Sequence, residues 1–387
     1  MPVELPKTVA LRKFAVKILL ITNILLALLL VLTYLSVYVS PDTSWIFAFI
    51  GMGYPFLLIL NLVFIIGWIA FRKWFFLISV LCILLGWNAF KRYFQFPFKK
   101  KEPVPTENTI RLLTYNVRLF NYYQWHRDTA SWQKIVDYIR SEDPDILCFQ
   151  EFITLPRGPH SLENLRKKLA PLSYSHVYYT DRVPGKLNFG MATFSKYPMV
   201  HKQMIEFENS LNGSMCTDLV LGSDTIRVYN CHLQSIRLRK DYNDLLDSLM
   251  FNYSEKQMDE LKELSVRMRQ AFIQRAGQVN ILSAHIQSSP YPVLVCGDFN
   301  DTPVSYVYQK LSHHLKDAFT ESGSGTGNTH RGSMPFVRID YVFYGPPFKS
   351  FHYHSERISH SDHFPLRIDF TIHEKADSTG HNSPPKE

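Results

Sequence analysis

Three long hydrophobic runs without a charged residue occupy most of the first hundred positions of the chain. They cover residues 18–39, 45–71 and 74–90, and tryptophans lie near several of their ends. A helix needs about 20 apolar residues to cross a bilayer, and interfacial tryptophans are typical of such helices. Buried helices of a soluble core are the alternative, but three such runs in succession are rare outside membranes. The pattern therefore predicts a transmembrane region at residues 1–98 with about three helices.

The pattern changes after a charged, proline-bearing stretch at residues 99–108, which we interpret as a linker. From residue 109 to 372, short apolar runs alternate with segments in which apolar residues recur every three or four positions. The longest such segment, 255–286, predicts an amphipathic helix. Strands that alternate with helices indicate an α/β domain. The polar residues 373–387 predict a disordered tail.

Polar residues directly follow several of the apolar runs, where a strand would end. The clearest case is the run 291–296, which leads into Gly297-Asp298-Phe299-Asn300-Asp301. Similar runs lead to Asn116, to Gln150 and Glu151, and to Asn230 and His232, and two further polar clusters near the end of the chain contain Arg338 and Asp340, and Asp362 and His363. These positions supply an oxygen-rich set of side chains that suits Mg²⁺ or Mn²⁺. Clusters of Cys and His, which a zinc site would need, are nearly absent.

The order of these motifs resembles that of the endonuclease/exonuclease/phosphatase superfamily, from about residue 109 to residue 370. The Gly-Asp-Phe-Asn-Asp stretch and Ser361-Asp362-His363 are specific in combination. The chain looks like a membrane-anchored bacterial type from the deoxyribonuclease/sphingomyelinase-like branch. The resemblance implies a four-layer α/β sandwich, in which two packed mixed β-sheets are flanked by helices and the active site lies at one end.

The resemblance also implies roles for single residues. The expected metal ligands are Asn116, Glu151 and Asp362, the expected catalytic residues are His232, Asp298, Asn300, Asp340 and His363, and the expected substrate-binding residues are Asn230 and Arg338. Asp298 and Asn300 would orient or deprotonate the attacking water. Asp340 would orient His363, which would contact a phosphoryl oxygen or transfer a proton. His232, which abasic-site endonucleases generally lack at this position, would protonate the leaving oxygen.

The net charge of +8 is distributed unevenly along the chain. Residues 1–101 contain 11 Lys or Arg and 2 Asp or Glu, and the remainder contains 31 basic and 32 acidic residues. All of the excess positive charge therefore flanks the membrane segments. The catalytic region lacks the basic surplus that tight, non-specific DNA binding requires, so nucleic acid is not favoured as a partner.

These observations predict a membrane-anchored, divalent-metal-dependent phosphoesterase that hydrolyses a phosphodiester with an activated water. A phospholipid headgroup, a nucleic acid and a soluble phosphate ester all remain candidate substrates. An endonuclease or exonuclease acting on DNA or RNA is one alternative, and a catalytically silent, membrane-tethered binding module is another. The sequence leaves the number of metals and the oligomeric state open. The five cysteines show no disulfide pattern and are interpreted as small buried hydrophobic residues.

Positive charges around the hydrophobic runs bear on the membrane topology. Lys7, Arg12, Lys13 and Lys17 precede the first run, no positive charge lies at 40–44, and Arg72 and Lys73 follow the second run. By the positive-inside rule these residues place the N-terminus in the cytoplasm. Three spans would then place the catalytic domain in the periplasm of a bacterial inner membrane. Lys91, Arg92 and residues 99–101 oppose this orientation, and a re-entrant or interfacial third run would return the domain to the cytoplasm.

Overall fold

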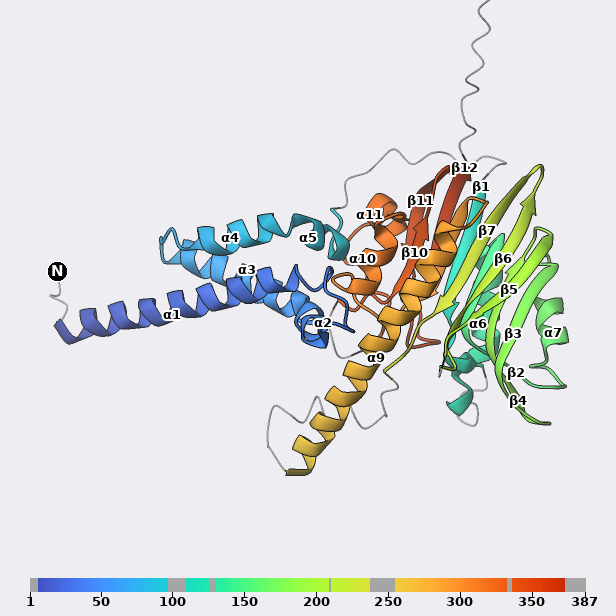
Figure 1. Cartoon of the computed structure of the whole chain (residues 1–387), viewed down its shortest axis with the longest axis horizontal. Helices are drawn as coiled ribbons and strands as arrows, with labels where there is room; N and C mark the ends of the chain where they lie inside the picture. Colours follow the sequence, from blue (N-terminus) through green and yellow to red (C-terminus); the bar gives the residue numbers. More distant parts are fainter. Residues whose placement is uncertain are drawn as a thin grey trace, which may run out of the picture.

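The computed structural model describes residues 6–96, 109–124, 130–208, 210–236, 255–332 and 336–372. The linker expected at 99–108 and the tail expected at 373–387 lie outside the described residues. Helices occupy the N-terminal part of the chain, and the strands begin at Thr109. The helical part projects from the larger sheet-containing domain as an elongated bundle (Figure 1).

Five helices form the N-terminal part, which we call the anchor: α1 (Pro6–Thr33), α2 (Trp45–Met52), α3 (Tyr54–Ala70), α4 (Phe76–Leu85) and α5 (Trp87–Tyr93). Among the described residues, one straight helix, Ala10–Thr33, is long and apolar enough to cross a membrane. The other two expected spans are not straight helices. The chain bends by 50° between α2 and α3 and by 77° between α4 and α5, so the number of spans is one to three, depending on whether each bent pair crosses as a unit.

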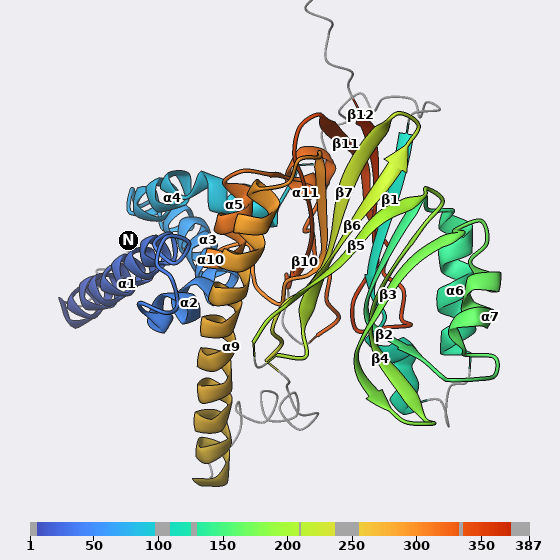
Figure 2. The ribbon, with the colours of Figure 1, turned by 45° about the vertical axis from the view of Figure 1, so that its right-hand side comes forward.

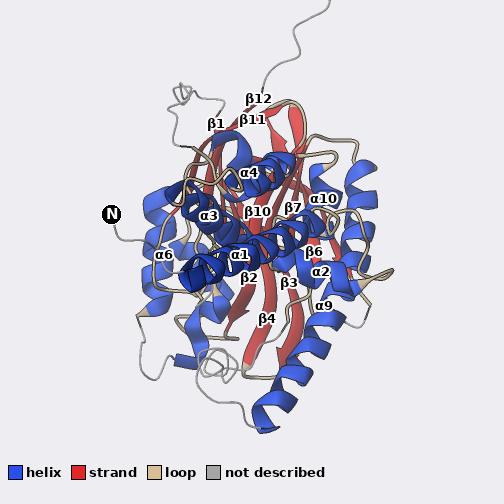
Figure 3. Ribbon diagram, turned by 90° about the vertical axis from the view of Figure 1, so that its left-hand side faces the viewer, coloured by secondary structure: helices blue, strands red, loops and turns tan. Residues whose placement is uncertain are grey.

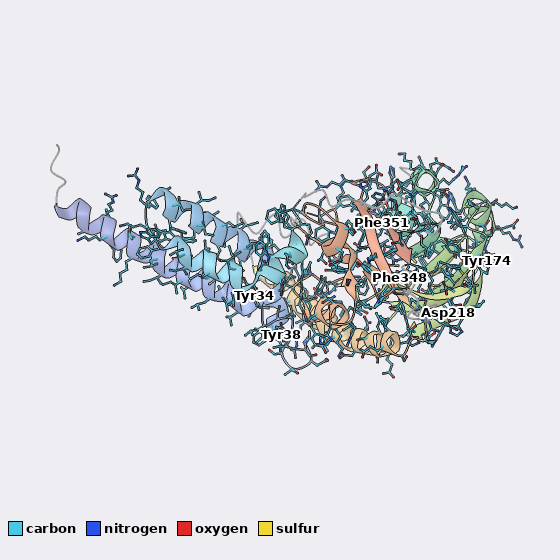
Figure 4. The ribbon with its side chains drawn as sticks, turned by 90° about the horizontal axis from the view of Figure 1, so that it is seen from above. Tyr34, Tyr38, Tyr174, Asp218, Phe348 and Phe351 are labelled. Carbon is cyan, nitrogen blue, oxygen red and sulfur yellow. The ribbon has the colours of Figure 1, made fainter. Side chains whose placement is uncertain are left out.

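The bends follow from the local sequence. Gly53 lies between α2 and α3, and Pro55 stands in the first turn of α3, where a missing backbone N–H costs no helical hydrogen bond. Gly86 separates α4 from α5, and a Cβ at Gly86 would collide with the ring of Tyr34. Seen from above, Tyr34 and Tyr38 lie where the anchor meets the domain, and Tyr174 lies on the side of the domain away from the anchor (Figure 4).

The domain contains two six-stranded mixed sheets. The first has the strand order β11-β12-β1-β2-β4-β3, and the second has the order β5-β6-β7-β8-β10-β9. Each sheet contains one parallel pair, β1 with β2 and β7 with β8, and its other pairs are antiparallel. The strands are β1 (Thr109–Asn116), β2 (Ile146–Thr154), β3 (Tyr174–Val183), β4 (Leu187–Ser195), β5 (Met199–Glu206), β6 (Gly213–Leu221), β7 (Asp224–His232), β8 (Val293–Asp298), β9 (Lys316–Asp317), β10 (Asp340–Tyr344), β11 (Phe348–Ser355) and β12 (Leu366–Ile372).

Helices cover the outer faces of both sheets, which confirms the predicted four-layer sandwich (Figure 2). The short helix η1 (Arg118–Gln124), α6 (Ser131–Glu142) and α7 (Leu162–Lys168) flank the first sheet, and α9 (Glu255–Gln287), α10 (Tyr306–Ser312) and α11 (Ala318–Ser322) flank the second. Between the sheets, Leu112 and Cys148 of the first belong to the same buried cluster as Val228 and Leu294 of the second. Full burial of an aliphatic side chain contributes about 1.5–3 kcal/mol to folding, so this cluster holds the layers together.

The anchor packs on the helices that cover the second sheet. Phe49 of α2 makes an edge-to-face contact with Phe272 of α9, with ring centroids 5.1 Å apart. Gln95, just after α5, forms a β-bridge with Gly325. Viewed along the bundle, α1, α3 and α4 stand in front of the sheets (Figure 3). The anchor and the domain are therefore joined by packed side chains as well as by the chain connection.

Candidate active site

The ends of β1 and β2 carry Asn116 and Glu151. The parallel register pairs Asn116 with Gln150, so Glu151 comes one residue later. Glu151 has a left-handed φ of 48° and lies at an irregularity between Phe149 and Phe152, where β2 slips against β4. A bulge of this kind re-aims a side chain at a sheet end. The Glu151 side chain is 34% exposed, so its carboxylate is open to a ligand from solvent.

The second sheet contributes His232 and Asp298, which are register partners at the ends of the parallel strands β7 and β8. Asn116 Nδ2 donates a 3.0 Å hydrogen bond to Asp298 Oδ2 and so connects the two sheets at this end. His232 Nε2 lies 3.7 Å from Asp298 Oδ2 and 3.8 Å from Glu151 Oε1. The side chains that the sequence placed at separate strand ends therefore meet at one end of the sandwich.

A tight turn fixes Asn300 beside Asp298. The Asn300 backbone N–H donates to Asp298 Oδ1 at 2.8 Å, and Asn300 Nδ2 donates to the carbonyl of Leu233 at 3.0 Å. Asn300 has a φ of 52°, a conformation that asparagine tolerates better than most residues. Gly297 has a φ of 130°, and a Cβ there would collide with the backbone of Cys231, so the motif requires glycine.

His363 and Asp340 form the second half of the site. Asp340 is the antiparallel partner of Asp298 at the start of β10. His363 Nδ1 lies 2.9 Å from Asp340 Oδ2, and its Nε2 lies 3.7 Å from Asp298 Oδ2. Ser361 Oγ donates to the carbonyl of Asn116 at 2.8 Å, which ties the segment that carries His363 to the end of β1.

The electrostatics of the site are dominated by buried carboxylates. Burial alone would lower the pKa of His363, but the carboxylates of Asp340 and Asp298 outweigh it and raise that pKa to about 10. Burial raises the pKa of Asp298, and Asp340 raises it further, whereas His363 and His232 oppose the rise. Burial likewise raises the pKa of Glu151. His363 is therefore an imidazolium at neutral pH, in a site that favours added positive charge.

A groove of about 360 Å³ opens beside this cluster. Glu151 and His232 form part of its wall. The other lining residues are Leu119, Thr180, Asp181, Phe189, Gly190, Met191, Leu211, Asn212 and Ser235. None of these described lining residues is Lys or Arg.

A family model described as the endonuclease/exonuclease/phosphatase family matches residues 113–363, which is more than half of the chain. The chain belongs to this family. The family includes phosphodiesterases, nucleases and phosphatases, and its members use divalent metals. The chain is thus a hydrolase that acts on phosphoester bonds. Residues 16–93 match a second model, which is described as a domain of unknown function, DUF8431.

Solved structures similar to the chain include other proteins of this type. An endonuclease/exonuclease/phosphatase from Beutenbergia cavernae DSM 12333 is 17% identical, with a TM-score of 0.49, and the match covers 69% of this chain and 72% of that one. The catalytic domain of human nocturnin with a bound sulfate anion is 19% identical, with a TM-score of 0.49 and coverage of 70% and 97%. No curated protein matches the chain.

The two residues that were expected to bind substrate, Asn230 and Arg338, lie outside the cluster formed by Glu151, His232, Asp298 and His363. Arg338 is 1% exposed and is ion-paired with Asp317, and its guanidinium carbon lies 4.6 Å from the ring centroid of Phe319. Asn230 is fully buried between the sheets, where it donates to the carbonyls of Phe149 and Ala192. Both side chains are engaged inside the protein, so substrate binding does not fit their positions, and we correct that expectation.

A compact group of possible metal ligands involves other residues than the three that were expected. The described His, Cys, Asp and Glu residues whose ligand atoms lie within 4.8 Å of one another are Asp298, Asp340 and His363, which were expected to be catalytic. Glu151 and Asn116 lie next to this group, whereas the Asp362 carboxylate pairs with Arg118 Nε at 3.1 Å. A contact between Asp362 and a metal would therefore compete with Arg118.

Sequence reasoning missed His330, whose ring centroid lies 5.0 Å from that of His363. The two residues also form a β-bridge. Burial lowers the pKa of His330, and the charge on His363 lowers it further, to about 4. His330 is therefore neutral beside an imidazolium. It follows no apolar run, so the strand-end pattern that found the other residues gave no signal for it.

Proposed function

We propose that the chain is a divalent-metal-dependent phosphodiesterase that hydrolyses its substrate by attack of a positioned water. The observation that carries the proposal is the geometry around the buried His363, whose Nδ1 lies 2.9 Å from Asp340 Oδ2 and whose Nε2 lies 3.7 Å from Asp298 Oδ2. A fixed positive charge next to carboxylates, at a sheet end that also carries Glu151 and His232, suits the stabilisation of a phosphoryl group during in-line displacement.

The donor set fits a hard divalent cation. Glu151 offers a solvent-accessible carboxylate, and the neighbouring Asn116 offers an amide oxygen, which are ligands that Mg²⁺ and Mn²⁺ prefer. The surrounding protein partly desolvates the Glu151 carboxylate and so raises its pKa, and an adjacent cation would therefore be favoured. A cation held there would neutralise negative charge on the phosphoryl oxygens.

The remaining side chains have complementary roles. Asp298 accepts a hydrogen bond from the Asn300 backbone, and its second oxygen lies 3.7 Å from both His232 Nε2 and His363 Nε2. In the proposed mechanism, Asp298 and Asn300 orient the attacking water. His363 donates a hydrogen bond to a non-bridging phosphoryl oxygen through Nε2, because Asp340 occupies its Nδ1. His232 lies on the groove side, where it protonates the leaving oxygen.

The charge and lining of the groove support a particular substrate class. The catalytic region has no basic surplus, and the groove wall combines apolar residues such as Phe189 and Met191 with the acidic Asp181. A phosphodiester of a lipid headgroup or a small soluble ester suits this surface better than double-stranded nucleic acid does.

We further propose that the anchor sits in a lipid bilayer. Its polar side chains point inward: Asn23 Nδ2 donates to Ser79 Oγ at 2.7 Å, Ser79 Oγ donates to Asn61 Oδ1 at 2.8 Å, and Trp68 Nε1 donates to Asn23 Oδ1 at 2.9 Å. Many of its leucines and isoleucines point outward, although Leu30, Leu58 and Ile83 pack in its core. Leu28 of α1, Ile66 of α3 and Leu81 of α4 are 56%, 68% and 63% exposed. Lipid chains would cover this outer surface, and polar contacts between helices are favoured within a bilayer.

The arrangement of the anchor helices supports the orientation expected from charge. The start of α1 and the turn between α3 and α4 lie far from the domain, whereas α2 and α5 lie next to it (Figure 1). Arg72 and Lys73 are therefore at the same end as the N-terminus. In a bacterial inner membrane, the positive-inside rule then places this end in the cytoplasm and the catalytic domain in the periplasm.

Hydrolysis of bis-p-nitrophenyl phosphate by the full chain in detergent tests the catalytic proposal. Activity should require Mg²⁺ or Mn²⁺, disappear with EDTA and return when either metal is added in excess. Hydrolysis that is unaffected by EDTA, or its absence with every divalent metal, would contradict the proposal. Parallel assays with phosphatidylcholine or sphingomyelin vesicles, single-stranded DNA and double-stranded DNA at equal phosphate concentration separate the substrate classes.

A further inference from the structure

The anchor covers the loop that follows Asp298 and Asn300. Residues 301–305 connect Asn300 to the start of α10, and we call this segment the 301–305 loop. Val304 in this loop is 1% exposed and belongs to the same buried cluster as Leu30 of α1 and Tyr54 of α3. The hydrophobic core of the anchor thus includes a residue that lies six positions after Asp298.

Polar contacts tie the backbone of the loop to the anchor. Ser36 Oγ lies 3.1 Å from the carbonyl oxygen of Val304 and 2.6 Å from that of Thr33, so its single hydroxyl proton is shared between the loop and the anchor. Arg92 Nη1 donates to the carbonyl of Pro303 at 3.2 Å. A third loop carbonyl, that of Asp301, accepts from Tyr341 Oη at 2.7 Å within the domain. Because a buried carbonyl without a donor is costly, these contacts favour a single position of the loop.

Gly51 of α2 shows how closely the anchor approaches the loop. A Cβ at this position would lie 2.6 Å from the carbonyl oxygen of Val304 and would also collide with Ser36. Glycine is therefore required by the close approach. Gly67 of α3 provides a contrast, because a Cβ there would meet nothing within 4 Å.

A second path runs through α9. Arg275 is fully buried and joins the loop after Asp298 to the loop after His232. It donates to Asp301 Oδ2 at 3.2 Å and to the carbonyl of Gln234 at 2.8 Å. Its guanidinium carbon lies 5.0 Å from the ring centroid of Phe272, the residue that packs edge to face on Phe49 of the anchor. The anchor therefore contacts the loops after both Asp298 and His232, one directly and the other through Arg275.

The catalytic turn is connected to these contacts by few bonds. Asn300 donates to Asp298 through its backbone and to Leu233 through its side chain, and the next residue, Asp301, is held by Arg275. Only three residues separate Val304 from Asn300. If Val304 moves, the short loop therefore has little freedom to keep Asn300 in place. The ligands Asn116 and Glu151 lie on the other sheet, away from the 301–305 loop.

We propose that the anchor is a positioning part of the active site, and that Ser36, Gly51 and Arg92 are positioning residues that hold the 301–305 loop and, through it, Asp298 and Asn300. The proposal rests on the function proposed above. It assigns the anchor a catalytic contribution in addition to membrane attachment. Changes at the contact between anchor and loop should alter the chemical step rather than metal or substrate binding.

Kinetics of the full chain in lipid nanodiscs test this with the matched pair Gly51→Ala and Gly67→Ala. Gly51→Ala should lower kcat by about tenfold or more, because small displacements of catalytic groups are costly, while KM and the half-activating Mn²⁺ concentration stay near the wild-type values. The loss should appear with both p-nitrophenol and alkanol leaving groups, because Asp298 acts on the attacking water in either case. Gly67→Ala should match the wild type.

Hydrogen–deuterium exchange gives a readout that does not depend on turnover. Peptides covering residues 299–305 should exchange faster in Gly51→Ala than in the wild type and Gly67→Ala, while peptides from β1 and β2 stay unchanged. If Gly51→Ala fails to insert or fold, Ser36→Ala is the second variant, because it removes the donor to Val304 without adding bulk. Ser36→Ala should lower kcat and loosen the same peptide, and Ser36→Thr, which keeps the hydroxyl, should restore both.

The outcomes separate the two proposals. A wild-type protein that hydrolyses no phosphodiester with any divalent metal contradicts the proposed function, and the exchange experiment still decides whether the anchor holds the loop. Wild-type kcat and wild-type exchange in Gly51→Ala and Ser36→Ala would overturn the positioning role. Equal losses in Gly51→Ala and Gly67→Ala would also overturn it, because the effect would then belong to the packing of the anchor itself.

Discussion

His363 and Asp340 form a buried ion pair, with Nδ1 2.9 Å from Oδ2. Asp298 lies on the other side of the imidazole, 3.7 Å from Nε2. Two carboxylates therefore share one imidazole, and together they overcome the effect of burial and raise the pKa of His363 to about 10. A group with this pKa is a charged hydrogen-bond donor at neutral pH and a poor general base. This relationship makes Asp298 the better candidate to act on the water.

The ion pair predicts a particular dependence of stability on pH in the metal-free protein. Because the folded pKa of His363 lies above the unfolded value of about 6.5, the folded state binds an extra proton between these values. The stabilisation is fully present below pH 6.5 and is lost as the pH rises towards about 10. Thermal melts in EDTA between pH 6 and 10 should show this decline, and Asp340→Asn should flatten it. Parallel curves for the two proteins would contradict the assignment.

Replacement of Asp298 with asparagine should abolish most activity and leave the fold intact. The change keeps the size of the side chain but removes the carboxylate that orients the water, so kcat should fall by about a hundredfold or more. Steady-state kinetics with bis-p-nitrophenyl phosphate measure the loss. Asp369→Asn is the matched control, because Asp369 is also 1% exposed but pairs with Arg111 near the opposite end of β1. Full activity in Asp298→Asn would rule out the proposed mechanism.

His232 is expected to matter most for poor leaving groups. His232→Asn should lose much of its rate on a diester with an alkanol leaving group, and far less on one that releases p-nitrophenolate, which departs without protonation. His176→Asn is a suitable control, because His176 is a buried histidine that bonds Thr217. Losses of the same size on both substrates would exclude His232 as the general acid.

The position of the metal can be tested at Glu151. Glu151→Gln keeps the shape but removes the negative charge, so the half-activating Mn²⁺ concentration should rise by about tenfold or more. Asp362→Asn should cause a smaller rise, because the Asp362 carboxylate is held by Arg118. Metal titrations of activity measure both. A wild-type metal requirement in Glu151→Gln would move the cation to the group formed by Asp298, Asp340 and His363.

Local signals in the sequence predicted an α/β domain and much of its site, and the family resemblance implied the four-layer sandwich. Strand-end patterns located Asn116, Glu151, His232 and Asp298, and register brings such residues together when strands are adjacent and parallel. The long helical period at 255–286 likewise corresponds to α9 (Glu255–Gln287). Apolar runs with caps and turns carry this information in a short window.

The sequence could not predict contacts between distant segments. The family resemblance implied a substrate-binding role for Arg338, but the structure pairs its buried guanidinium with Asp317. His330 reaches His363 through a loop contact that leaves no periodic pattern. The bends of 50° near Gly53 and 77° near Gly86 divide two of the hydrophobic runs into pairs of helices, and hydropathy alone does not give their angles.

The membrane orientation can be decided with reporter fusions to the C-terminus of the full chain. In the orientation proposed here, Arg72 and Lys73 share the cytoplasmic end with the N-terminus, and the domain lies outside. Lys91, Arg92 and residues 99–101 then lie on the outer side, against the usual charge bias, but Arg92 is held by Pro303 and Gln309 of the domain. A C-terminal alkaline phosphatase should therefore be active, and a C-terminal green fluorescent protein should be dark. Bright fluorescence would place the domain in the cytoplasm and would indicate that the bent pair α4 and α5 does not cross the membrane.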